Sequence, residues 1–263
     1  MNQPYLWVVR SEDRVSGTSS AFKFNAGGDY RLAQMAVKHI DLLEVVIPNT
    51  IYNIRSGVNN TFTVTHGGSF TVTLTPGIYT IDDLLTEVAA RLLVADNTLS
   101  WTATYSAKTK KVSISNVSLT DFTLTFLTTS PDEELGFPLT NNASTIFSSA
   151  SGVLTATNVF NVGRPYDLHI NIQEFGQTAR CTKTYNNATF VCTFSVNGGT
   201  ILDWTARDHY DQHCRFTPPR NIYELNVTLK LGNGEIADLN GEEWAMYFRV
   251  HPGEEEGNKK RKI

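Results

Sequence analysis

An antiparallel all-β fold, a single jelly-roll sandwich with one short amphipathic helix, is predicted by three observations. Short runs in which apolar and polar residues alternate recur along the 263-residue chain, and a period of two is typical of half-buried strands. Aromatic and β-branched residues, which suit a pleated surface, are abundant. Only one stretch has helical spacing. A jelly roll can hold about a dozen short strands in one domain of this length.

Strands are expected wherever the alternation holds. The ranges are 6–9, 21–24, 37–47, 61–65, 70–74, 101–105, 112–114, 122–126, 168–172, 189–196, 214–217, 225–231 and 244–250. The clearest hairpin turns at Gly67-Gly68, a dipeptide suited to positive φ. The segment 232–234 predicts a second tight turn between the last two strands.

The longest apolar run changes phase before it ends at Pro48. Ile40 and Leu42 share one face of an extended chain, whereas Val45 and Ile47 share the other. This shift predicts either a β-bulge or burial on both faces, and a central strand fits both. Pro48 cannot donate to a ladder, so residues 49–60 are expected to form a crossing segment or loop.

The single helix is predicted to follow Pro76-Gly77. The apolar residues at helical spacing are Ile81, Leu84, Leu85, Val88 and Leu92. Thr80 can cap the first turn, and Asp82 and Asp83 suit the positive end of the helix dipole. The sequence therefore predicts one short helix packed on a β body.

One domain is expected over residues 1–252, followed by a charged tail at 253–263. The tail contains three glutamates followed by four cationic residues, and it has almost no apolar side chain to bury. We therefore expect it to be disordered. The segment 176–204 could be a small hairpin insertion on the sandwich. The long connection Ser130–Gly152 mixes Pro, Gly, Asn and Ser, and is expected to be exposed.

The composition excludes several classes of protein. A formal charge of −4 argues against a protein that coats nucleic acid. The three cysteines, Cys181, Cys192 and Cys214, form no ligand pair or disulfide framework, and we interpret them as reduced thiols. No apolar stretch is long enough for a signal peptide or membrane span, so synthesis in the cytosol is expected.

No enzyme signature is present, because the chain lacks a phosphate-binding Gly-rich loop, a nucleophile elbow and paired Cys-x-x-Cys sites. In a strand, His209, Asp211 and His213 would point the same way and could ligate a metal. The competing interpretation is a polar loop or edge strand that carries two histidines by chance. We expect no catalytic residue, no cofactor and no functionally required metal.

Two further groups of residues have alternative interpretations. Trp7, Trp101, Trp204 and Trp244 could form a sugar-binding platform, although core packing is commoner in alternating strands. The cations of Lys259–Lys262 could contact nucleic acid or an anionic lipid surface, or serve nuclear import. The simpler interpretation of these cations is a solvated tail, so they are only a weak candidate contact.

Six segments, taken in order, resemble a known family. They are Val8–Thr18, Val46–Ile54, Thr75–Tyr79, Leu135–Phe137, Leu229–Gly234 and Asp238–Trp244. Together they resemble the minor capsid, or penton, proteins of virophages, Polinton-like viruses and related large double-stranded DNA viruses. No single motif is specific, and the order of the motifs carries the resemblance.

The resemblance implies a single jelly roll that forms a homopentamer at the five-fold vertices of an icosahedral capsid, among trimers of a double-jelly-roll major capsid protein. It implies location in the virion after synthesis in the host cytosol, with assembly at a cytoplasmic or nuclear virus factory. A fibre or host receptor could bind on top. Family members often carry an insertion domain, expected here to be small or absent.

Two segments are our candidates for contacts between subunits, Ser130–Gly152 and Asn49–Asn60, because each is extended and poor in charge. The alternative function is that of a jelly-roll carbohydrate-binding or metal-dependent protein, whose site would be formed by loop aromatics or by residues 209–213. Solution mass separates the two functions, since a lectin or enzyme need not be a ring of five.

Overall fold

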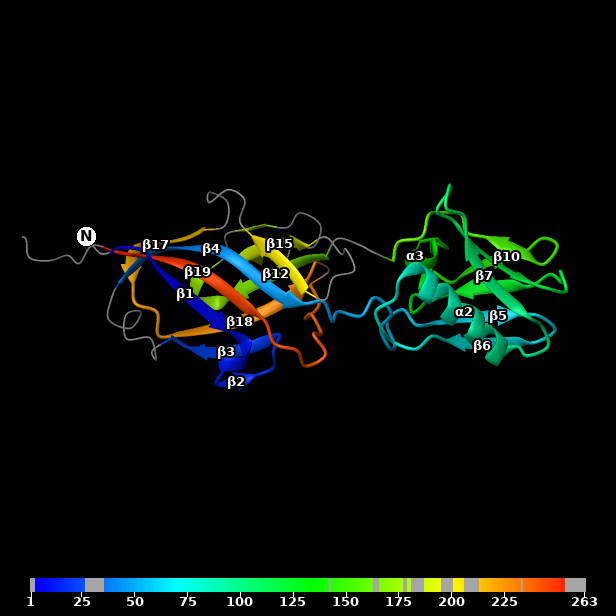
Figure 1. Ribbon diagram of the computed structural model, residues 1–263, viewed down its shortest axis with the longest axis horizontal. Helices are drawn as coiled ribbons and strands as arrows, with labels where there is room; N and C mark the ends of the chain where they lie inside the picture. The colour runs from blue at the N-terminus through cyan, green and yellow to red at the C-terminus, as the bar shows by residue number, and fades with distance from the viewer. Residues whose placement is uncertain are drawn as a thin grey trace, which may run out of the picture. The chain divides into compact units, whose positions relative to one another are not determined.

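The computed structural model describes residues 3–26, 36–141, 143–162, 166–176, 179–180, 187–194, 201–205, 213–232 and 234–253. The chain forms two compact units, each with its own core (Figure 1). Met1–Ile51 and Pro165–Ile263 form the first, the jelly-roll unit. Tyr52–Arg164 form the second, the inserted unit. This division differs from the single domain expected over residues 1–252.

The jelly-roll unit contains two large antiparallel sheets, and the strands given next belong to them. Its strands are β1 (Tyr5–Arg10), β2 (Ser16–Gly17), β3 (Ala21–Asn25), β4 (Val37–Pro48), β12 (Tyr166–Ile172), β15 (Phe190–Phe194), β16 (Ile201–Thr205), β17 (His213–Arg220), β18 (Glu224–Leu231) and β19 (Ala245–Pro252). One sheet has the order β1-β19-β4-β16, with β17 also on β4, and the other has the order β15-β12-β18-β3-β2. The first and last long strands are therefore neighbours, as are the second and the last but one. This is the strand order of a jelly roll.

The core of this unit lies between the two sheets. Val9, Ile40 and Met246 from one sheet belong to the same buried cluster as Leu168 and Leu229 from the other. The predicted all-β antiparallel sandwich is therefore confirmed. Short 3₁₀ turns at Ser11–Asp13 and Gln173–Phe175 follow β1 and β12.

The phase change in β4 is a β-bulge. Tyr247 pairs with Glu44 and Phe248 pairs with Leu42, so Leu43 is the extra residue on β4. Because of the bulge, Ile40 and Leu42 before it and Val45 and Ile47 after it all face the core. β4 is a central strand that lies between β19 and the pair β16 and β17. Of the two predicted explanations, the bulge is correct.

The segment 176–204 differs from the predicted hairpin insertion. Its described residues include β15, which pairs with β12, and most of β16, which pairs with β4. Only the short pair β13 (Ala179–Arg180) and β14 (Asn187–Ala188) forms a separate hairpin. The segment supplies a strand to each sheet because Phe190, Cys192 and Phe194 alternate into the core.

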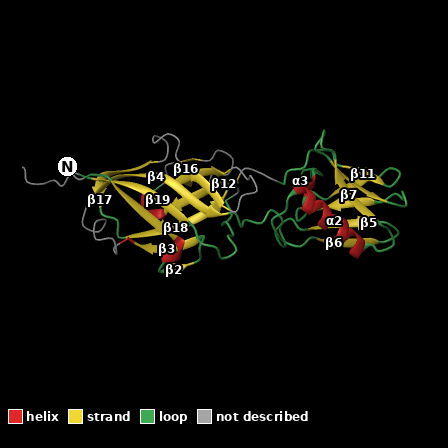
Figure 2. Cartoon of the chain, viewed as in Figure 1, coloured by secondary structure: helices red, strands yellow, loops and turns green. Residues whose placement is uncertain are grey.

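The inserted unit has two further antiparallel sheets, the predicted helix and one additional short helix. Its elements are β5 (Thr61–Thr65), β6 (Ser69–Thr73), α2 (Ile81–Ala95), β7 (Trp101–Tyr105), β8 (Val112–Asn116), β9 (Thr123–Phe126), α3 (Asp132–Leu135), β10 (Thr145–Ser148) and β11 (Val153–Thr155). The sheet orders are β10-β9-β5-β6 and β11-β8-β7, and α2 contacts β7 and β6 (Figure 2). The expectation of a small or absent insertion does not match this unit.

The predicted helix and hairpin are both present here. Thr80 caps α2 through its side-chain oxygen, which accepts from the backbone N–H of Asp83 at 3.2 Å. The residues that α2 buries are Leu84, Leu85, Val88 and Leu92. Among the described helices, none is long and apolar enough to cross a membrane.

The boundary between the body and the tail lies one residue later than expected. Gly253 is buried, and its backbone N–H donates to the carbonyl of Ala36 at 2.6 Å. The disorder predicted for residues 253–263 is therefore wrong at Gly253, and residues 254–263 lie outside the described residues.

Candidate functional site

The first and last of the six motif segments meet in the jelly-roll unit. Ser11 Oγ donates to Glu243 Oε2 at 2.5 Å, and Arg14 Nη1 donates to Glu243 Oε1 at 2.6 Å. The backbone N–H of Trp244 donates to Ser11 Oγ at 2.9 Å, and its indole N–H donates to the carbonyl of Ser19 at 2.7 Å. Residues more than 200 positions apart therefore form one hydrogen-bonded cluster, here called the motif cluster: Ser11, Arg14, Ser19, Glu243 and Trp244.

Local structure positions both halves of this cluster. The 3₁₀ turn at Ser11–Asp13 buries Ser11 and brings Arg14 back toward the Ser11 carbonyl, which it contacts at 2.8 Å. Partial burial of Glu243 opposes ionisation, but hydrogen bonds from Arg14 and Ser11 outweigh it and hold the pKa of the Glu243 carboxyl below its usual value. The carboxylate is therefore ionised and fixed at neutral pH.

A third motif segment joins the same end of the unit. Thr50 Oγ1 donates to the carbonyl of Leu239 at 2.8 Å, and Asn240 Nδ2 donates to the carbonyl of Thr50 at 2.5 Å. Asn240 and Gly241 both have positive φ, 52° and 84°. This left-handed turn, typical of Asn and Gly, returns the chain toward β19.

A groove of about 310 Å³ opens beside these contacts, here called the motif groove. Its lining residues are Arg10, Glu12, Val46, Pro48, Ile201, Glu243, Trp244, Ala245 and Tyr247. Val46, Ala245 and Tyr247 alternate with core residues, so they lie on the outer face of the sheet. Ile201 on β16 is 59% exposed. The groove thus combines an apolar floor with charges of both signs at its rim, as protein interfaces do.

The two segments predicted to make subunit contacts instead pack several of their side chains into the protein's own cores. In Asn49–Asn60, Ile51 and Ile54 are buried, and buried Asn59 and Asn60 bond to backbone groups. The side chains of Asn59 and Asn60 therefore hold this segment in turns, and it is not the extended chain that was expected.

The connection Ser130–Gly152 contains more regular structure than expected. It includes α3 and the edge strand β10, and it buries Leu135 and Phe137 in the core of the inserted unit. Ile146 on β10 remains 65% exposed. Only the part of this connection near β10 therefore keeps an apolar surface.

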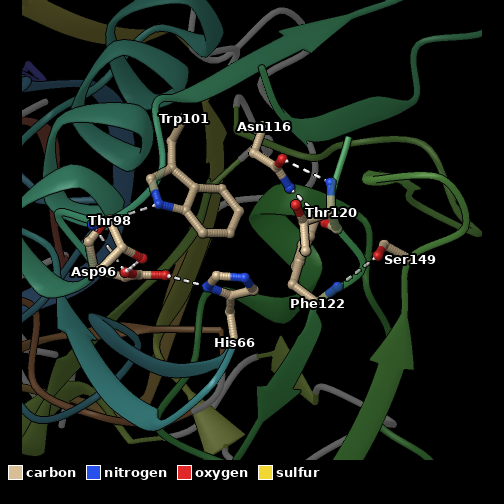
Figure 3. A network of polar contacts seen from close by, with 8 residues as sticks. All are labelled: His66, Asp96, Thr98, Trp101, Asn116, Thr120, Phe122 and Ser149. Atoms are coloured by element: carbon tan, nitrogen blue, oxygen red, sulfur yellow. Dashed lines mark hydrogen bonds and ion pairs between the residues drawn. The ribbon is translucent and has the colours of Figure 1, made fainter. Parts of the chain in front are cut away.

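A polar network in the inserted unit has catalytic residue types without catalytic geometry (Figure 3). Asp96, just after α2, accepts from the hydroxyl of Thr98 at 2.5 Å and lies 3.2 Å from His66 Nδ1. The hydroxyl therefore donates to a carboxylate, with no imidazole placed to take its proton. Trp101 Nε1 donates to the carbonyl of Asp96, so the network joins the end of α2 to β7.

The other contacts in the same view hold turns. Asn116 Nδ2 donates to the carbonyl of Thr120 at 2.7 Å, and Asn116 Oδ1 accepts from the backbone N–H of that residue (Figure 3). Ser149 Oγ accepts from the backbone N–H of Phe122 at 2.8 Å. The Asn116 bonds hold the turn that follows β8, and the Ser149 bond extends the pairing of β10 with β9 by one residue.

The residues considered for a sugar platform or a metal site are placed as follows. Trp7, Trp101 and Trp244 are buried, and Trp204 packs against the core of the jelly-roll unit. Their flat faces are therefore used for packing. His213 is exposed on β17, and His209 and Asp211 lie outside the described residues.

The cysteines that the structure describes are free and buried, as expected for reduced thiols. They are Cys192 and Cys214. Burial raises the pKa of Cys192 far above its usual value and that of Cys214 to about 11, so both thiols are protonated and unreactive at neutral pH. Cys181 lies outside the described residues.

Comparisons with known proteins add a likeness to solved structures. No protein-family description matches the chain, and no curated protein matches it. Among solved structures, the chain is similar to the selenomethionine-labelled penton protein of mavirus, with 9% identity, a TM-score of 0.47, and coverage of 95% of this chain and 92% of that one.

Proposed function

We propose that the protein is a structural component of a viral capsid and forms the pentameric vertex of an icosahedral shell. The observation that carries the proposal is the meeting of three motif segments around the motif groove of a jelly roll. These segments belong to the ordered set that resembles penton proteins. Jelly rolls occur in viral capsids, lectins and cupins, so the fold alone leaves those classes open.

The motif groove is the surface through which we expect neighbouring subunits to meet. Its floor carries exposed Ile201, and its rim carries Arg10 beside Glu12 and Glu243. A ring needs two different surfaces on each subunit, and each must match the other in charge and shape. Charges of both signs at one rim suit such a contact.

The lectin alternative has less support. A sugar platform needs exposed aromatic faces, whereas three of the four tryptophans are buried and the fourth packs against a core. Within the described residues, the polar networks join strands and close turns. We therefore keep the structural role as the function and assign no reaction.

The expected partners follow from the proposal. They are four further copies of this chain, a double-jelly-roll major capsid protein, and a fibre or receptor at the vertex. The location is the virion, after synthesis in the host cytosol and assembly at a virus factory. Contact of Lys259–Lys262 with nucleic acid stays a prediction, because these residues lie outside the described part of the chain.

Native mass spectrometry over a range of concentration and salt, with and without the shell protein, tests the ring. We expect a species of five chains that Ile201→Asp disrupts, because a charge on the groove floor would be buried at the contact. The matched control is Val117→Asp, an exposed apolar position in the inserted unit outside both segments predicted to make subunit contacts.

Imaging of assembled particles with an antibody to this chain completes the test. The label should lie at the five-fold vertices. Dimers or tetramers in solution, together with particles that carry no vertex label, would exclude the proposal. Five-chain rings that Ile201→Asp leaves intact would retain the capsid role and reject the motif groove as the contact.

A further inference from the structure

Three potential metal ligands gather on the outer face of the jelly-roll unit, away from the motif groove. His39 and Asp41 are two positions apart on β4, so their side chains point the same way. His251 on β19 is the register partner of His39. Ile40 and Leu42 alternate with them and face the core. One ligand atom from each of the three residues lies within 4.8 Å of the other two.

We propose that His39, Asp41 and His251 bind one divalent ion of the zinc class, which ties β4 to β19. Imidazole and carboxylate are ligands that such ions prefer, and three protein ligands plus a water complete a tetrahedral site. The site is independent of the capsid role, because it uses neither the motif groove nor a second chain.

The first support is geometric. His251 Nε2 lies 2.8 Å from Asp41 Oδ2. The rings of His39 and His251 stack with centroids 3.8 Å apart and 18° between their planes, so one ring must turn before both can direct an in-plane lone pair at the same ion. Tetrahedral zinc with bonds near 2.1 Å places neighbouring ligand atoms roughly 3.4 Å apart. Asp41 and His251, which now share a hydrogen bond, would need to separate by about 0.6 Å.

The second support is a nitrogen without a partner. Nδ1 of His39 is buried and accepts or donates no hydrogen bond among the described residues. Buried polar atoms are normally satisfied, so such an atom calls for an explanation.

The surrounding charges determine which ions can bind. Arg249 is the register partner of Asp41 on β19, and Arg215 is the partner of His39 on β17. With only one carboxylate among these cations, the site does not suit magnesium or calcium, which prefer several oxygen ligands. Zinc binds imidazole nitrogens well, whereas magnesium and calcium do not.

The test is a titration of the full chain, stripped with a chelator, with Zn²⁺ and separately with Mg²⁺ by calorimetry. Co²⁺ provides a second readout, because its visible absorption reports nitrogen and oxygen coordination. We expect one Zn²⁺ bound per chain, no response to Mg²⁺, and a rise in melting temperature with Zn²⁺. Asp41→Asn and His251→Gln should each weaken binding by more than about tenfold.

The matched control is His66→Gln in the inserted unit. His66 also faces a carboxylate, that of Asp96 at 3.2 Å, but it belongs to no described group of three ligands. This variant should bind Zn²⁺ like the parent. Circular dichroism identifies any variant that fails to fold. If both ligand variants fail, His39→Gln decides the assignment, because it removes a ligand and leaves the contact between Asp41 and His251 in place.

Two outcomes would overturn the proposal. Absence of Zn²⁺ binding by the folded parent would leave Asp41 and His251 as a hydrogen-bonded pair with the stacked imidazole of His39 beside it. Equal binding by the parent, Asp41→Asn and His251→Gln would assign the ion to other residues.

Discussion

Glu243 is the residue on which the motif cluster depends. It accepts from both Ser11 and Arg14, and side chains of Arg14 and Glu243 are about one third exposed, 28% and 35%. Solvent therefore weakens the ion pair, whereas the hydrogen bond from buried Ser11 is less affected. The residue joins the start of the jelly-roll unit to its last strand.

Replacing Glu243 by Gln should lower the free energy of unfolding at pH 7 by about 1 kcal/mol. Because the folded-state pKa of Glu243 is depressed, its contribution is present above the unfolded pKa and disappears as pH falls through the folded one. Urea unfolding of parent and variant from pH 7 to pH 3 measures this difference.

Glu12→Gln is the control for that experiment. Glu12 pairs with Arg10 at 3.3 Å with both side chains more than half exposed, so the loss should be close to zero. An equal loss for Glu12→Gln and Glu243→Gln would show that the motif cluster has no special role in stability.

Glu134 behaves in the opposite way. Burial raises the pKa of its carboxyl to about 7, although a hydrogen bond from Asn59 Nδ2 at 3.0 Å opposes the shift. Between the unfolded pKa of 4.5 and the folded value of about 7, the folded state keeps a proton that the unfolded chain has lost. Stability must therefore fall as pH rises through this window.

Glu134→Gln should remove that loss, because the amide is neutral at every pH. At pH 8 the variant is expected to be more stable than the parent by about 2 kcal/mol, and below pH 4.5 the two should be similar. Unfolding of the inserted unit, followed across pH, provides the measurement. Glu133→Gln, at an exposed neighbour, should leave the pH dependence unchanged, and a parent without any such dependence would contradict the assignment.

At the scale of elements, the N-terminus of α2 can be tested directly. Thr80→Ala removes the side-chain oxygen that accepts from the Asp83 N–H, and it should cost about 1 kcal/mol. Thr86→Ala is the control, since Thr86 lies inside the helix, where Ala is the better helix former. Thermal unfolding compares the two. If both variants lost the same stability, the cap would be unimportant.

The sequence predicted the elements whose signal is local. The turn at Gly67-Gly68, the spacing of α2 and the phase change in β4 are each set by residues within one element, and all three agree with the structure. The chemistry of the motif cluster was not predictable from spacing, because Arg14 and Glu243 are separated by 229 positions. Their meeting depends on the pairing of β1 with β19.

The division into two units escaped prediction for a related reason. The inserted unit is also built of short alternating strands, so no change in composition marks its borders near Tyr52 and Arg164. The role of 176–204 was missed because Phe190 and Cys192 indicate a buried strand without indicating which partner strand it joins. Pairing between distant strands is a property of the whole fold.

At the scale of the molecule, the two separate cores predict that the two units fold and unfold independently. Residues 52–164, expressed alone, should unfold cooperatively and with the same midpoint as within the full chain, because their buried cluster is complete in itself. Calorimetry of the full chain and of this fragment makes the comparison. Leu124→Ala, in the core of the inserted unit, should shift only one transition of the full chain.

An unfolded fragment, or one transition that shifts as a whole with Leu124→Ala, would contradict this independence. The stability of the inserted unit would then depend on residues outside 52–164. A fragment that folds with an unchanged midpoint would establish the unit as an autonomous domain.

The position of the inserted unit has a consequence during synthesis on the ribosome. β4 emerges early, but every strand that pairs with it, β16, β17 and β19, is translated after the inserted unit. At roughly 5–20 residues per second, this central strand waits on the order of ten seconds for its first partner. The inserted unit is contiguous and can fold during that interval. The nascent chain therefore carries a finished domain next to an apolar strand with two open edges, which is the kind of segment that chaperones bind.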